Sequence, residues 1–235
     1  MKAVIICVGD ELLTGDTVNT NAAWLAKKLN DRGVYVCRIV TIPDDIDEIA
    51  DTISRSEFRA DLIFVMGGLG PTHDDMTREG VAKAVNKKLV RNPDAQKMLS
   101  SFKENPNVMH TADLPEGSEV LKNPVGVAPG FISNSHIIVL PGVPGELKGI
   151  FNSISKRFSG VESKTEWIFT TQYESDVVET LKEALNLFPE VKVGSYPGLE
   201  KVDGHNIYRL KIRLNSTNFD MLNQAKKWLE PKLLG

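Results

Sequence analysis

The first part of the chain alternates between short apolar runs and longer amphipathic segments. Continuous apolar runs, rich in β-branched residues, occupy positions 3–8, 34–40 and 62–66, as expected for strands covered on both faces. Apolar residues then recur with helical spacing in segments that begin near residues 20 and 45 and after residue 77. This alternation predicts right-handed crossovers and a mainly parallel sheet.

The pattern changes after residue 90. Residues 91–118 are polar and contain three prolines, and we expect one helix over 95–104 followed by an irregular, exposed excursion. Short strands are expected at 118–121, 127–133 and 136–140. The last two strands would form a hairpin through Asn134 and Ser135. An amphipathic helix follows and stops near Gly160, which marks a domain boundary.

Residues 163–235 have a separate pattern of strand, helix, strand, strand and helix, with the inner strands expected at 191–196 and 206–213. At about 70 residues, this segment is expected to be a small α+β module beside the larger domain of residues 1–160. Its order of elements resembles RNA-binding α+β folds, but the sequence shows no G-x-x-G segment and no basic, aromatic pattern. We therefore expect a packing or dimerisation element.

The most informative loop follows the strand at 62–66 and reads GGLGPTHDDMT. It lies between the carboxyl end of a buried strand and the next helix, where open parallel sheets bind ligands. Its glycines would let backbone N–H groups approach an anion. The adjacent carboxylates of Asp74 and Asp75 would repel a bare phosphate, so they favour a divalent cation bridging carboxylate and phosphate. The alternative is a glycine turn with Asp75 or Thr77 capping the helix.

Two further segments are candidates for the same crevice. The loop GDELLTG follows the first strand, where Asp10 and Glu11 would bind a metal or position a water, and Asn19 would cap a helix or bind a ligand. The segments NPVGVAPG and LPGVPGEL are rich in proline and glycine at the two ends of the expected hairpin. All of these residues also suit ordinary caps and tight turns.

Charge and composition limit the classes of partner that this protein is expected to have. The chain has 235 residues with 28 Lys+Arg and 31 Asp+Glu, a net charge of −3, which argues against a nucleic-acid partner held by bulk phosphate attraction. No apolar run approaches the roughly 20 residues that span a bilayer, and the N-terminus is expected to be a strand, so we predict a cytoplasmic protein with no membrane contact. Cys7 and Cys37 lie in apolar runs and are expected to be buried thiols.

Taken in order, the motifs GDELLTG, NTN, GGLGPTHDDMT, NPVGVAPGF and LPGVPGEL closely resemble the CinA-like proteins. The N-terminal part of that family belongs to the molybdopterin-binding MoaB/Mog-type superfamily, and the resemblance covers about residues 1–160. It implies an α/β fold, a three-layer α/β/α sandwich, and a homodimer. No deamidase domain follows in this sequence, so nicotinamide-nucleotide deamidation is not expected.

The resemblance also implies a site for a nucleotide or pterin phosphate, often with a divalent metal (Mg²⁺, Mn²⁺ or Co²⁺). Asp74 and Asp75 would hold the metal. Gly67, Gly68, Gly70 and Thr72 would form the phosphate site with them, and Pro141, Gly142 and Pro144 a neighbouring wall. From the sequence itself, Thr77 and Asn19 are further candidate ligand-binding positions. Pterin-handling relatives typically have an Arg-Asp pair where this chain has Asp74-Asp75, and the second carboxylate favours a metal-bridged diphosphate.

Three functions are consistent with these residues. The first is a metal-dependent hydrolase of ADP-ribose or FAD-type diphosphates, in which Asp74 and Asp75 bind the metal and Asp10 or Glu11 assists the water. The second is a molybdopterin-binding or adenylyl-transferring protein of molybdenum cofactor biosynthesis. The third is a non-catalytic ligand-binding protein of the same fold.

Overall fold

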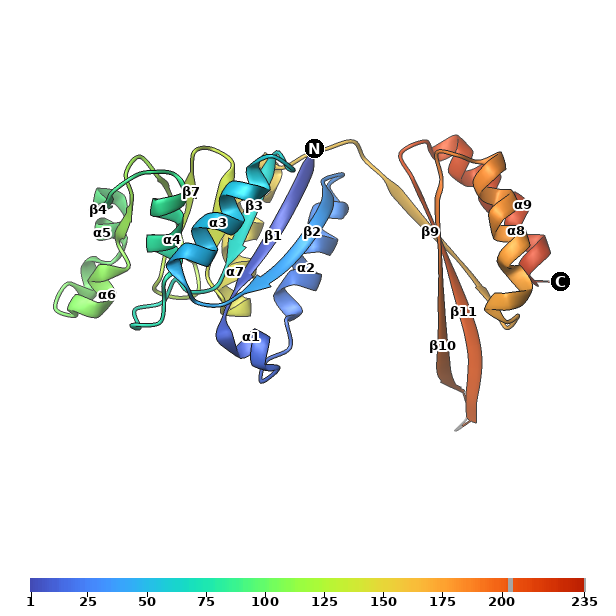
Figure 1. The fold of residues 1–235 in the computed structure, drawn as a ribbon, viewed down its shortest axis with the longest axis horizontal. Helices are drawn as coiled ribbons and strands as arrows, with labels where there is room; N and C mark the ends of the chain where they lie inside the picture. The colour runs from blue at the N-terminus through green and yellow to red at the C-terminus, as the bar shows by residue number, and fades with distance from the viewer. Residues whose placement is uncertain (203–204, 235) are drawn as a thin grey trace. The chain divides into compact units, whose positions relative to one another are not determined.

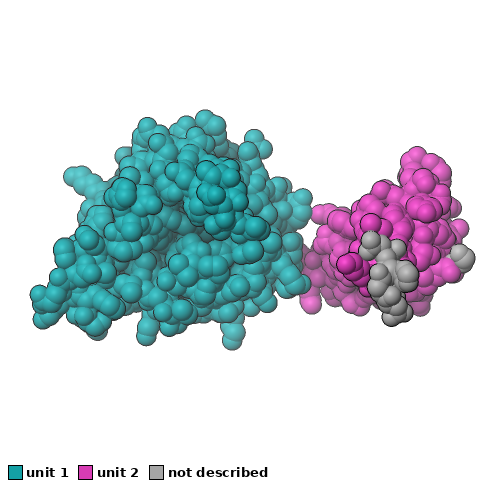
Figure 2. Space-filling view, turned by 90° about the horizontal axis from the view of Figure 1, so that it is seen from below, with its two compact units in different colours: residues 1–160 teal, residues 161–235 magenta. Residues whose placement is uncertain are grey.

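The computed structural model describes residues 1–202 and 205–234. The chain divides into two compact units, residues 1–160 and residues 161–235 (Figures 1 and 2). Each unit has its own hydrophobic core. In the described part of the chain, no helix is both long and apolar enough to cross a membrane.

Unit 1 is built on a six-stranded sheet of β1 (Lys2–Val8), β2 (Tyr35–Ile42), β3 (Leu62–Met66), β6 (Glu119–Leu121), β7 (Gly130–Ser133) and β8 (Ile137–Leu140). Two further strands, β4 (Leu89–Arg91) and β5 (Asp113–Pro115), form a separate two-stranded sheet. Its α-helices are α1 (Asp10–Thr14), α2 (Thr20–Asn30), α3 (Ile46–Glu57), α4 (Thr77–Ala84), α5 (Pro93–Met98), α6 (Pro106–His110) and α7 (Pro144–Ile154). The sheet order is β2-β1-β3-β8-β7-β6, and the first four strands are parallel. The prediction of a mainly parallel sheet is confirmed.

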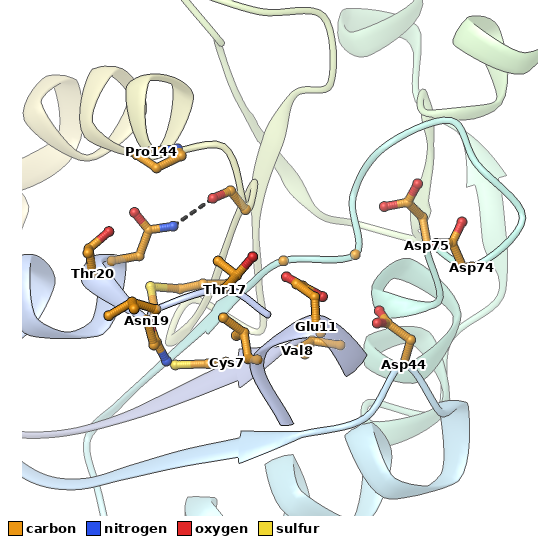
Figure 3. Close-up of a pocket in the computed structure, with 18 residues that line it drawn as sticks. Cys7, Val8, Glu11, Thr17, Asn19, Thr20, Asp44, Asp74, Asp75 and Pro144 are labelled. Carbon is orange, nitrogen blue, oxygen red and sulfur yellow. Dashed lines mark hydrogen bonds between the residues drawn. The ribbon is translucent and has the colours of Figure 1, made fainter. Parts of the chain in front are cut away.

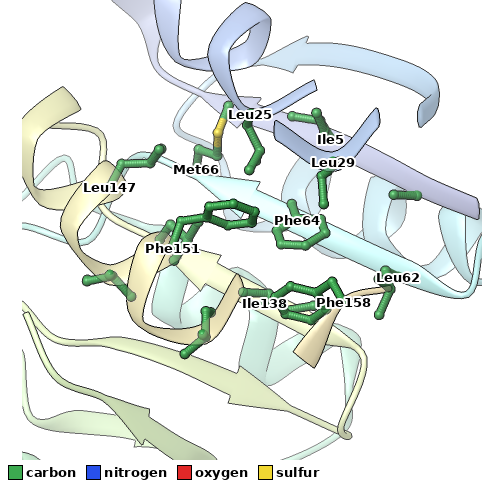
Figure 4. Close-up of a cluster of buried hydrophobic side chains, with 14 of the residues drawn as sticks. Ile5, Leu25, Leu29, Leu62, Phe64, Met66, Ile138, Leu147, Phe151 and Phe158 are labelled. Carbon is green, nitrogen blue, oxygen red and sulfur yellow. The ribbon is translucent and has the colours of Figure 1, made fainter. Parts of the chain in front are cut away.

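Helices cover both faces of this sheet. Successive residues of β1 point to opposite faces: Ile5 packs with α2 and α7, whereas Ile6 packs with α3 and α4. On the first face Phe64 contacts both Phe151 and Phe158, with ring centroids 6.2 and 5.2 Å away (Figure 4). The fold is therefore the three-layer α/β/α sandwich that the resemblance implies.

Several expectations for unit 1 need correction. The segment expected to be irregular contains α6 and β5, which pairs with β4 in a two-stranded sheet. The helix expected over 95–104 is α5 with a separate 3-10 turn at Ser100–Phe102. Asn92 and Asn105 each cap a helix whose first residue is proline, so these prolines begin helices. The strand expected from residue 127 begins at Gly130.

Other corrections concern the first two strands. The polar loop after β1 contains the short helix α1. Cys37 is exposed because β2 is an edge strand of the sheet, so only Cys7 is a buried thiol. The hairpin turn, by contrast, is confirmed: Asn134 and Ser135 have φ values of 47° and 65°, the left-handed conformation that two-residue hairpins require.

Unit 2 is the α+β module expected from the sequence. Its elements are β9 (Lys164–Thr170), α8 (Glu174–Leu187), β10 (Lys192–Val202), β11 (His205–Ser216) and α9 (Phe219–Leu234). The antiparallel sheet has the order β10-β11-β9, both helices lie on one side of it, and the inner strands are longer than expected (Figure 1). The other side exposes aromatic and basic residues, among them Trp167 and Arg213. The expectation of a module without such a pattern is wrong, because these residues lie on different strands and meet only in the folded sheet.

Candidate functional site

A cavity of about 240 Å³ lies at the carboxyl ends of β1 and β3 (Figure 3). The chain leaves β1 and returns as β2 on one side, then adds β3 on the other side. Connections that depart in opposite directions leave a crevice between these two strand ends, and this is the usual ligand site of open α/β sheets. Loops from both strands, from the start of α2 and from the start of α7 contribute to its wall.

Gly67 and Gly68 form the wall nearest the sheet. Gly67 has a φ of 105°, and a Cβ atom there would lie 2.1 Å from the carbonyl oxygen of Val8, so no other residue fits without moving β1. Gly68 has a φ of 59° and lines the cavity. No described residue accepts a hydrogen bond from the Gly68 amide. The Gly68 amide is thus a donor without an acceptor among the described residues, in a residue that lines the cavity.

Asp75 determines the shape of the rest of this loop. Its carboxylate accepts hydrogen bonds from the amides of Gly70 (2.7 Å) and Thr72 (2.9 Å) and from the Thr72 hydroxyl. Two of the amides expected to bind phosphate therefore already have an internal acceptor. The alternative in which Asp75 or Thr77 caps α4 is wrong, since the N-cap residue is Met76 and no side chain caps this helix.

Arg78 binds the backbone of the same loop, a role that the sequence analysis did not predict. Its side chain is 1% exposed, and Nη1 donates to the carbonyl oxygens of Leu69 (2.8 Å) and Gly70 (3.1 Å). Burial lowers the pKa of this guanidinium, while Glu79, Asp75 and Asp113 oppose that shift. The sequence does hint at this role, because Arg78 lies on the same side of α4 as Val81, where apolar residues are expected.

Carboxylates gather on one side of the cavity. Figure 3 shows Glu11, Asp44, Asp74 and Asp75 there. Burial raises the pKa of Asp44; the Asp10 amide, which donates to its Oδ2 at 3.1 Å, opposes the shift, and the charges of Asp10, Glu11 and Asp74 add to it. Asp44 was also missed, although it follows β2, whose carboxyl end lies beside that of β1.

Asp74 differs from Asp44 in its surroundings. It is exposed, and the nearby polar side chain of Thr72, followed by its own backbone amide, lowers its pKa. Asp74 therefore stays ionised in ordinary conditions and remains accessible at the cavity.

The opposite side of the cavity is formed by uncharged polar groups. Asn19 caps α2, its side chain accepting from the amide of Ala22 at 3.0 Å. Asn21 Nδ2 donates to the carbonyl oxygen of Gly142 at 2.6 Å, which joins the start of α2 to the loop before α7. The other atom of this amide group, Asn21 Oδ1, is buried and has no hydrogen-bond partner. It is an unsatisfied acceptor in a residue that lines the cavity, and it would reach a bound molecule after a rotation of the Asn21 amide.

The structure brings most of the expected residues to this one cavity. The wall includes Glu11, Asn19, Gly67, Gly68, Asp74, Asp75, Gly142 and Pro144. Five expected residues lie outside the wall: Asp10, Gly70, Thr72, Thr77 and Pro141. Thr77 is fully buried beneath Gly68 and its hydroxyl has no partner. Among the described residues, no three His, Cys, Asp or Glu side chains are arranged to hold a metal ion.

Family comparison identifies the architecture. The family described as "Probable molybdopterin binding domain" matches residues 4–159, and the family described as "FAD synthase, middle domain" matches residues 163–234. A CinA-like protein of Frankia casuarinae is 42% identical over 167 residues, which cover 65% of this chain and 39% of that protein. The chain belongs to the CinA-like proteins with a probable molybdopterin-binding domain.

Individual relatives support this assignment. A protein of Archaeoglobus fulgidus is 43% identical over 198 residues, covering 84% of this chain and 86% of that protein. The crystal structure of CinA from Thermoplasma acidophilum is 38% identical with a TM-score of 0.64, and the match covers 67% of this chain and 97% of that one. The cavity of this CinA-like protein therefore lies in the part of the chain that its family defines as the molybdopterin-binding domain.

Proposed function

We propose that unit 1 binds a phosphorylated pterin, or a nucleotide of similar size, in the cavity between β1 and β3. The observation that carries this proposal is the position of the cavity at the point where the sheet connections diverge. Gly68, whose amide has no acceptor among the described residues, lines it on one side, and Asn21, whose Oδ1 has no partner, lines it on another. The family description supports the pterin as ligand.

The two free polar groups suggest how such a ligand would lie. The Gly68 amide is suited to a phosphate oxygen, because a backbone donor beside a glycine allows close approach. Asn21 Oδ1 is buried and unpartnered, and a rotation of this amide on binding would let it accept from an N–H group of a pterin or purine ring. The phosphate would thus lie near the carboxyl end of β3 and the ring near the start of α2.

The carboxylates require a counter-charge if a phosphate enters. Mg²⁺ commonly uses one or two protein carboxylates and completes its coordination with phosphate oxygens and water. Asp74 together with Asp44 or Glu11 fits that donor set, whereas a metal site made by protein groups alone does not fit the described residues. A divalent ion that arrives with the ligand is therefore part of the proposal.

Calorimetric titration of the full chain tests this function. The ligands would be a pterin phosphate, ADP and ADP-ribose, each with Mg²⁺ and with a chelator. We expect metal-dependent binding that weakens by about tenfold in Asn21→Ala, because one hydrogen bond to the ring is lost and its partner is left unsatisfied. Glu104→Gln serves as the control, since this acid does not line the cavity. Equal affinities for wild type and Asn21→Ala would refute the proposed orientation.

A second candidate function is metal-dependent hydrolysis of a nucleotide diphosphate. The group of carboxylates around Asp44 favours it, since a metal held there would polarise a diphosphate and activate a water. AMP release from ADP-ribose or FAD is the readout. Asp74→Asn is the informative variant, because Asp74 is exposed, whereas Asp75→Asn would disturb the loop that Asp75 holds. Binding without AMP release under any of the tested metals would leave only the first function.

A further inference from the structure

The face of the unit 2 sheet away from its helices carries aromatic and cationic side chains. Residues that alternate with them, such as Ile168 and Ile212, point into the core against α8 and α9. On the open face Trp167, Phe169 and Tyr196 are 41%, 45% and 47% exposed. Monomeric proteins seldom leave three large aromatic side chains exposed on one sheet face without a binding role.

The strand register places cations among these rings. Trp167 on β9 pairs with Arg213 on β11, and Lys211 on β11 pairs with Phe169 on one side and Tyr196 on the other. The rings of Trp167 and Tyr196 approach each other across β11, with centroids 5.8 Å apart and planes tilted by 56°. The central strand therefore carries positive charge between aromatic side chains of its two neighbours.

Gly194 makes this arrangement possible. A Cβ atom at this position would lie 3.1 Å from the hydroxyl and 3.2 Å from a ring carbon of Tyr196, which shows that the ring lies over the glycine. A Cβ atom there would require the ring of Tyr196 to shift by a few tenths of an ångström. The glycine thus lets this ring lie close against β10.

The charge on this face is positive even though the whole chain is acidic. Arg209 and Lys211 share one acid, Glu200, at 3.4 and 2.8 Å. Arg213 has no acidic partner among the residues that the structure describes. The acids of α8 lie on the helical side of the module, beginning with Glu174 and Asp176 in its first turn.

We propose that this sheet face binds single-stranded nucleic acid. Bases stack on exposed aromatic rings while the phosphates lie next to lysine and arginine, and neighbouring rings on one strand are about 6.6 Å apart, enough for separate bases. An acidic peptide would pair with the cations but would offer no flat rings for stacking. An apolar partner, or a second copy packed on the same face, would bury Arg213 without a counter-charge.

Fluorescence anisotropy with the full chain tests the proposal. The probe is a fluorescein-labelled oligo-U or oligo-dT of about 15 nucleotides, titrated at low salt. We expect saturable binding that Trp167→Ala weakens by about tenfold, because a stacking platform is lost. Phe58→Ala is the matched control, since Phe58 is an exposed aromatic residue of unit 1 at 92% exposure. Binding should also quench tryptophan fluorescence, and Trp167→Phe should bind while losing that quenching.

The contribution of charge is measured by salt dependence. Each phosphate contact on single strands contributes about 0.7 to the slope of log affinity against log salt concentration, so Arg213→Gln should reduce the slope by about that amount. Lys182→Gln, on the exposed surface of α8, should leave it unchanged. Saturating ADP should not compete, which separates this face from the cavity of unit 1.

Three results would overturn the proposal. One is the absence of binding to either oligonucleotide at low salt. Another is binding that Trp167→Ala and Arg213→Gln leave unchanged. The third is a dimer of the wild type, seen by sedimentation, that Trp167→Ala converts to monomer, since the face would then bind a second copy.

Discussion

Asp44 is a residue of the candidate site whose pKa is raised. It lies at the end of β2, is partly buried, and faces the charges of Asp10, Glu11 and Asp74. Other residues of the site act on the backbone: Asp75 and Arg78 hold the glycine loop from two sides. Asp75 and Arg78 thus determine the shape of the loop, whereas the carboxylates around Asp44 place negative charge at the cavity.

Replacing Asp44 by asparagine should stabilise the protein at neutral pH. Because burial raises the pKa of Asp44 above its ordinary value of 3.8, the unfolded chain loses this proton first as pH rises, and ionisation costs folding free energy. The cost is fully present above the folded-state pKa and disappears below 3.8. Melting temperatures of wild type and Asp44→Asn should therefore differ at pH 7 and converge at pH 3. Glu162→Gln, at an exposed position, is the control. A difference that persists at pH 3 would contradict this account.

At the scale of elements, backbone conformation explains both the successes and the failures of sequence analysis. The apolar runs of β1 and β3 and the helical spacing of α2 and α3 were sufficient to predict the layers of unit 1. The prolines at 93 and 106 were misleading because an asparagine before each of them caps a helix. The open face of unit 2 could not be predicted, since Trp167 and Arg213 are 46 positions apart and only their register brings them together.

The hairpin between β7 and β8 gives a test at this scale. Ser135 has a φ of 65°, a conformation that costs a residue with a Cβ atom roughly 1 kcal/mol. Ser135→Gly should therefore raise the free energy of unfolding by about 0.5–1 kcal/mol, measured from urea denaturation. Ser101→Gly, where φ is not positive, should give no such gain. Equal or lower stability of Ser135→Gly would show that the turn is not strained.

At the scale of the whole molecule, the chain consists of two units with separate cores. The apolar clusters of unit 1 contain no residue of unit 2, and the cluster of unit 2 contains none of unit 1.

The candidate cavity was predictable to the level of its loops, because parallel strands bring their carboxyl ends together. Asn21 Oδ1 and the free Gly68 amide were not, because hydrogen bonding depends on tertiary contacts. The homodimer expected from the resemblance remains a prediction.

Separate cores predict separate unfolding. Ile212 is fully buried in unit 2, and Ile212→Val should destabilise that unit by about 0.5–1.5 kcal/mol. Differential scanning calorimetry should show two transitions, of which Ile212→Val shifts one. Ile6→Val, in the core of unit 1, should shift the other. A common shift of both transitions in either variant would show that the units unfold together.

The carboxylate of Asp75 has a consequence for how fast a ligand binds. A glycine-rich loop without such a group would sample many conformations until an anion arrived, and binding would carry the entropy cost of ordering it. In this protein the amides of the loop already donate hydrogen bonds to the carboxylate of Asp75. The binding surface is therefore preorganised, so association should proceed at the rate of diffusional encounter, and differences in affinity between ligands should arise mainly from their rates of dissociation.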